Sequence, residues 1–231
     1  MSLNVKSIKI MFNYINYMKI IFNHINSIDL TFNSIISIDL MFNYIKSIKI
    51  IFDHVKSIEI MFNHINFMKL MLLNIKSMKI MFNYVNFMKI TLLNIIFIEI
   101  MFDYINYMKI MRLNVIFMNL IFDDINSMKI MFDDVNSMEI IFNNVNSIEI
   151  MFDDINSMKI IFDDINSMEI TFNDINSIEI IFDYVNFIEI ISSNIIFMDL
   201  TFDHVNFMKI MLLNIIFINL IFDHINFIEL I

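Results

Sequence analysis

The sequence predicts a β-rich repeat fold, a β-solenoid with about 20 residues in each coil. Three observations predict it: the chain consists of tandem ten-residue units, apolar residues alternate with a period of two inside each unit, and Asn or Asp recurs after each alternating segment. In the 23 units, position five is always Ile or Val, position eight is Ile or Met, and position ten is Ile or Leu. Phe occupies position two in 17 units.

The alternating segment of each unit predicts a strand. In residues 147–152, the apolar residues Ile148, Ile150 and Phe152 alternate with residues that face the other way, as in a half-buried strand. A polar corner follows, of the form Asn/Asp-x-Ile-Asn. Because Asn and Asp tolerate left-handed backbone best among residues other than Gly, and the chain has no Gly, we expect Asn and Asp to make every bend.

A longer period of 20 residues lies within the ten-residue one. After the first unit, the units without Phe at position two are units 8, 10, 12, 20 and 22, all even-numbered. Two strands and two corners would therefore form one coil that buries positions two, five, eight and ten. About eleven coils spaced ~4.8 Å apart give a rod of roughly 50–55 Å. No Pro-, Gly- or Ser-rich linker interrupts residues 1–231, so we expect a single tandem-repeat array.

Two segments resemble the core motif of leucine-rich repeats, LxxLxLxxNxL. Residues 145–155 read VNSIEIMFDDI, with Asp153 in the place of the motif's Asn, and residues 165–175 keep the Asn as Asn173. The resemblance implies a scaffold for protein interactions rather than an enzyme.

The alternative fold is an all-α arrangement of long helices, in a bundle or at a membrane surface. Ten residues of helix rotate by about 1000°, so the apolar stripe would circle such a helix. The longest uncharged stretch, residues 210–222, contains two Asn residues and is shorter than the 18–20 or so apolar residues of a membrane span. We therefore expect no transmembrane segment. The absence of Cys and of a recognisable signal peptide favours an intracellular, cytoplasmic protein.

Charge is distributed unevenly along the chain. Residues 1–120 carry 12 basic and 6 acidic side chains, and residues 121–231 carry 3 basic and 19 acidic ones. This pattern is typical either of a dipolar rod that associates head to tail or binds a cation, or of a solvated face on which position nine drifted from Lys to Glu. With a single Arg and a modest basic excess, we expect no nucleic-acid partner.

Paired carboxylates are the sharpest candidate site. In a 20-residue coil, Asp133 and Asp134 would stack under Asp153 and Asp154, and clustered carboxylates suit Ca²⁺, which accepts about six to eight oxygens. The Asn residues at position six would add carbonyl oxygens: Asn126, Asn136, Asn156 and Asn166. The alternative is that these Asp residues are exposed corner residues. No cofactor is expected.

A second candidate cluster contains histidine. His204 and His224 would lie one coil apart, with Asp203 and Asp223 beside them, and two imidazoles can bind a metal. Tyr often occupies the same position four, as at Tyr184, which indicates instead a permissive surface position.

No catalytic constellation is evident, because the chain has no Cys nucleophile and no Gly-rich phosphate loop. The sequence therefore predicts a non-enzymatic structural or interaction scaffold whose partners are other proteins or itself. Its alternative is an expanded AT-rich minisatellite reading frame that self-associates, with little selected function, since Ala, Gly and Pro are absent. A helical membrane-surface protein is the third hypothesis.

Overall fold

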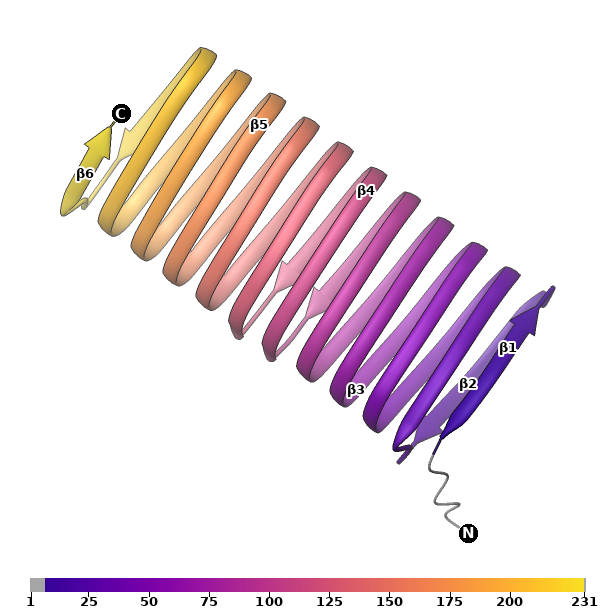
Figure 1. Cartoon of the computed structure of the whole chain (residues 1–231). Helices are drawn as coiled ribbons and strands as arrows, with labels where there is room; N and C mark the ends of the chain where they lie inside the picture. The colour runs from indigo at the N-terminus through magenta and orange to yellow at the C-terminus, as the bar shows by residue number, and fades with distance from the viewer. Residues whose placement is uncertain (1–6, 231) are drawn as a thin grey trace.

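The chain forms a rod of stacked β-coils (Figure 1). The computed structural model describes residues 7–230, except for the side chains of residues 112 and 113. Its strands are β1 (Ile8–Asn13), β2 (Tyr17–Asn23), β3 (Ser27–Phe102), β4 (Ile105–Phe122), β5 (Ile125–Phe222) and β6 (Phe227–Leu230). These residues contain no helix, so the all-α and helical membrane-surface alternatives are wrong. Accordingly, no helix in this range is long and apolar enough to cross a membrane.

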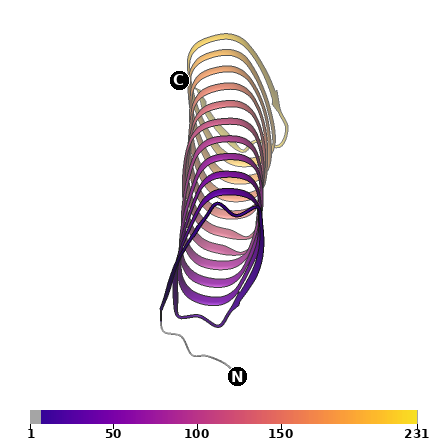
Figure 2. The ribbon, with the colours of Figure 1, turned by 90° about the vertical axis from the view of Figure 1, so that its right-hand side faces the viewer.

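Strand residues pair in parallel with the residues 20 positions later, except at some corner positions. Ile8 lies opposite Ile28 at the start of the stack, Met108 opposite Met128 in the middle, and Phe207 opposite Phe227 near its end. This register confirms the β-solenoid with about 11 turns of roughly 20 residues. Figure 2 shows the coils as flattened ovals stacked upon one another.

The strands are far longer than one side of a coil because pairing continues around the corners. β3 has 76 residues and β5 has 98. At a corner of the first coil, the amide of Tyr14 donates to the carbonyl of Asn33 at 3.2 Å, and the amide of Ile36 donates to the carbonyl of Ile15 at 3.1 Å. Backbone groups at these bends are thus satisfied by the neighbouring coil.

Positions two, five, eight and ten form the core, as predicted. The rod has two long sides, face A and face B. Face A is formed by positions seven to ten of each odd-numbered unit and positions one to three of the even-numbered unit that follows. Face B is formed by positions seven to ten of each even-numbered unit and positions one to three of the odd-numbered unit that follows. Behind face B, position two is Phe in every coil from Phe22 to Phe222, and consecutive rings stack with centroids 4.6–5.3 Å apart.

The corresponding column behind face A is interrupted. Leu72, Leu92 and Ser192 replace Phe there and are buried, and Leu212 packs partly buried against the core. All units without Phe at position two after the first unit therefore belong to one side of the rod. Their even numbering follows from the 20-residue register, which gives each side of the rod every second unit.

The bends differ from the prediction in one respect. Position four adopts left-handed φ in every unit from Tyr14 to His224, with φ between 36° and 56°. The residues there include Tyr, His and Ser as well as Asn and Asp, so the expectation that Asn and Asp make every bend was wrong. Left-handed backbone costs roughly 1–2 kcal/mol for a residue with a Cβ. Burial of the following Ile or Val and the pairing on both sides hold the bend in place.

Candidate functional site

The candidate site residues lie in columns along the corners of the rod. At a corner, position three is partly buried at the end of the strand, and the left-handed bend turns the position-four side chain outward. Because coils stack in register, the side chains of adjacent coils at these positions lie next to one another. A polar residue that recurs every 20 positions therefore forms a ladder, a column of like side chains along the rod.

The structure brings Asp133, Asp134 and Asp154 together, with one carboxylate oxygen from each within 4.8 Å of the others. Burial first, and then the charges of Asp134, Asp153 and Asp154, raise the pKa of Asp133 above its ordinary value. Burial, Asp153, Asp134 and Asp174 likewise raise the pKa of Asp154. The carboxylates therefore repel one another, and a hard cation would relieve that repulsion.

The fourth predicted residue, Asp153, belongs to an overlapping group with Asp154 and Asp174. Asp174 lies outside the predicted set because Asn173 precedes it, so it is not part of an Asp-Asp pair. Its position exactly one coil after Asp154 was the signal that would have found it. Calcium binding at these residues stays a prediction.

The position-six Asn residues form ladders with one another. Asn156 donates its amide to the carbonyl oxygen of Asn136 at 3.0 Å, and Asn146 donates to Asn126 at 2.8 Å. The carbonyl oxygens of Asn156 and Asn166 accept in the same way from Asn176 and Asn186. The oxygens expected to complete a calcium site are thus engaged in hydrogen bonds between coils.

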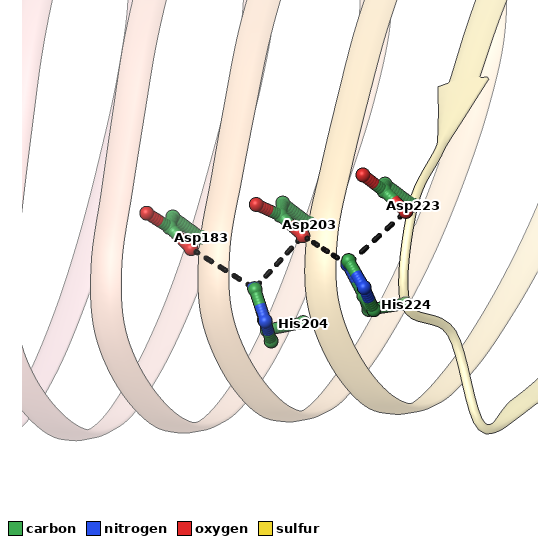
Figure 3. Close-up of polar contacts among 5 residues, drawn as sticks. All are labelled: Asp183, Asp203, His204, Asp223 and His224. Carbon is green, nitrogen blue, oxygen red and sulfur yellow. Dashed lines mark hydrogen bonds and ion pairs between the residues drawn. The ribbon is translucent and has the colours of Figure 1, made fainter.

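The histidine cluster forms a second corner group (Figure 3). The rings of His204 and His224 stack with centroids 4.6 Å apart. Nδ1 of His224 lies 3.2 Å from Oδ1 of Asp203 and 3.0 Å from Oδ1 of Asp223. Nδ1 of His204 lies 2.8 Å from Oδ1 of Asp203. The predicted proximity is confirmed, and Asp203 lies between the two imidazoles.

Another set of residues was missed by the sequence reasoning. Position nine of face A carries lysine in five consecutive coils and then glutamate in three: Lys49, Lys69, Lys89, Lys109, Lys129, Glu149, Glu169 and Glu189. Beside the middle lysines, position seven of face A holds Phe67, Phe87 and Tyr107, whose rings form a ladder with centroids 5.7 and 4.8 Å apart. The signal for this row is the 20-residue spacing of its lysines, which the net charges of residues 1–120 and 121–231 do not reveal.

Most lysines of face A have no counter-charge. Lys129 pairs with Glu149, but within residues 7–230 no ion pair is formed by Lys49, Lys69, Lys89 or Lys109. On face B, each position-nine lysine has an acidic partner in the next coil. Lys79 lies 2.8 Å from Glu99, and Lys159 lies 3.3 Å from Glu179.

Comparison with protein-family models, curated proteins and solved structures finds no match for this chain. The geometry of the rod and the chemistry of its exposed columns therefore carry the functional argument.

Proposed function

We propose that the chain is a non-enzymatic repeat scaffold that binds protein partners along the long sides of its rod. One observation carries the proposal: outward side chains recur at the same position in successive coils, so each face presents continuous rows instead of one local pocket. Rows spaced ~4.8 Å apart on a stiff support suit an extended protein surface. The leucine-rich-repeat-like pattern of residues 145–155 supports the same use.

Exposed aromatic residues mark where such partners would bind. At position seven, the exposed fractions of Phe67 and Phe87 on face A are 59% and 41%, and those of Phe97 and Phe117 on face B are 45% and 49%. Large apolar side chains that remain exposed in adjacent coils are typical of interaction surfaces. Elsewhere in the same two rows the position is Ser, as at Ser127, so the fold itself tolerates Ser there.

The test is a comparison of two matched double variants, Phe67→Ser/Phe87→Ser on face A and Phe97→Ser/Phe117→Ser on face B. Proteins that copurify with the tagged chain from its native cells are quantified for both variants and the parent. We expect each variant to lose a distinct set of partners while its circular dichroism spectrum stays unchanged. Equal copurification by all three folded chains would overturn the scaffold proposal.

A further inference from the structure

The position-nine row of face A has a self-complementary order of charges. Five stacked lysines, from Lys49 to Lys129, are followed by Glu149, Glu169 and Glu189. Like charges directly opposite each other on neighbouring strands are destabilising, and four of these lysines have no ion-pair partner within the described residues. Anionic groups from outside the chain would therefore stabilise the row.

We propose that a second copy of this chain binds face A to face A, with the two rod axes antiparallel. This inference rests on the proposed scaffold function and names its partner. The two-fold axis runs parallel to the strands, midway between the Lys129 and Glu149 coils. Since both copies share one coil spacing, every coil on one copy meets a coil on the other, and each contact occurs twice.

This arrangement brings opposite charges together along the row. Lys109 faces Glu169 of the second copy, and Lys89 faces its Glu189. The outermost pair joins Lys49 to Glu229 of the second copy. Within the position-nine row the one unfavourable pair is Lys69 with Lys209, and Lys209 already binds Glu189 within its own chain at 2.9 Å. In the position-three row, Asp133 also meets Asp153 of the second copy, which is a second like-charge contact.

The apolar rows of face A match in the same register. Phe87, 41% exposed, meets Phe187 of the second copy, 39% exposed, and Met131 meets Met151, which are 38% and 43% exposed. Tyr107 lies opposite the small Ser167. Ten overlapping coils, each presenting about six strand residues, cover roughly 900–1000 Å² per copy. The resulting total is at the upper end of the roughly 1,200–2,000 Å² of a standard stable interface.

A polyanion is the competing occupant. Lysines beside exposed aromatic rings also suit single-stranded nucleic acid, which binds by phosphate contacts and base stacking. Such a ligand would use the lysine half of face A and be repelled by Glu149, Glu169 and Glu189 on the other half. A second copy matches both halves, so the observations favour it.

Sedimentation velocity of the purified full chain tests the proposal across protein and salt concentration. We expect a dimer at low ionic strength that dissociates as salt rises. Lys89→Glu changes two attractive contacts into repulsive ones, and we expect it to raise the dimer Kd on the order of 30–100-fold. Lys159→Glu makes the same charge change on face B and should leave the Kd unchanged. Circular dichroism spectra establish that each variant is folded.

A charge swap tests the register. Lys89→Glu/Glu189→Lys restores attraction across the interface and should recover most of the affinity that Lys89→Glu loses. Lys89→Glu/Glu169→Lys would recover it only if the two-fold axis lay one half-coil away, at Lys129. Recovery by the second double variant instead of the first would overturn the proposed register.

Two outcomes would overturn the dimer itself. One is a folded chain that stays monomeric at low salt up to about 100 μM. The other is a monomer that binds an oligothymidine in a fluorescence-anisotropy titration and loses that binding in Lys89→Glu, which would assign face A to a polyanion. Either result leaves the copurification test of the scaffold intact, so failure of this inference is distinguishable from failure of the proposed function.

Discussion

Replacing Phe142 by Ala tests whether the phenylalanine ladder behind face B holds the rod together. Phe142 is fully buried and stacks between Phe122 and Phe162, with centroids 4.7 and 4.8 Å apart. Truncation of a buried Phe costs about 3–5 kcal/mol, and each stacked aromatic pair adds roughly 0.5–1.5 kcal/mol beyond its buried area. Because two stacked pairs are lost, we expect a loss of about 4–8 kcal/mol in the free energy of unfolding.

Urea unfolding followed by circular dichroism measures this loss, and hydrogen exchange locates it. Since each coil contacts only its neighbours, amides of the coils that contain Phe122, Phe142 and Phe162 should lose protection first. Phe222→Ala is the matched control, because Phe222 is 41% exposed and stacks only on Phe202; about 1–1.5 kcal/mol is expected there. Equal losses for Phe142→Ala and Phe222→Ala would refute the reasoning.

The remaining predictions concern polar groups. Ser192 is buried in the phenylalanine column behind face A, and its hydroxyl has no hydrogen-bond partner. Ser192→Leu should therefore raise the free energy of unfolding by about 1–3 kcal/mol. Urea unfolding measures this change, and a decrease would contradict the prediction. Asn106 forms hydrogen bonds of 2.6 Å with the Asn residues of both neighbouring coils. Asn106→Leu should lower the free energy of unfolding by roughly 1–2 kcal/mol. An unchanged urea midpoint would show that the Asn ladder does not stabilise the fold. Burial and nearby carboxylates raise the pKa of Asp133, Asp154 and Asp163 above 3.8, so the folded state binds protons more readily than the unfolded state. The ionised carboxylates therefore destabilise the folded state fully at pH values above their raised pKa, and this effect disappears below the ordinary pKa of Asp. The urea midpoint should therefore rise as pH falls from 7 towards 4. The rise should be smaller in Asp154→Asn. If Ca²⁺ binds these carboxylates, millimolar Ca²⁺ should raise the Tm of the parent and not that of Asp154→Asn; equal shifts in both would reject these residues as the site.

The coil and its core were predictable because two periods act together in the sequence. Alternation places Ile148, Ile150 and Phe152 on one side of a strand, and the 20-residue period determines which strands stack. The bends were less predictable, because local preference favours Asn or Asp there, whereas Tyr104 and His204 adopt left-handed φ as well. Stacking on both sides of each coil overrides a preference worth roughly 1–2 kcal/mol.

The candidate site was predictable to the extent that its members share a period. The spacing of 20 residues correctly grouped Asp133, Asp134 and Asp154, and brought His204 next to His224. The ladder bonds of the Asn side chains were not predicted, since the same amide that offers a carbonyl oxygen to a metal also offers a donor to the next coil. Once stacking is in register, the donor and acceptor of successive Asn residues satisfy each other.

The order of charges on the two faces bears on whether position nine drifted or was selected. On face B, each lysine has acidic neighbours in its column: Lys19 lies 2.7 Å from Asp39, and Lys159 lies 3.3 Å from Glu179. On face A, lysine instead follows lysine from Lys49 to Lys129. Drift on two equally solvated faces would produce the same kind of order on both. On face B every lysine is compensated within one chain, whereas face A keeps lysines together despite their repulsion, as expected of a surface whose counter-charges belong to a partner.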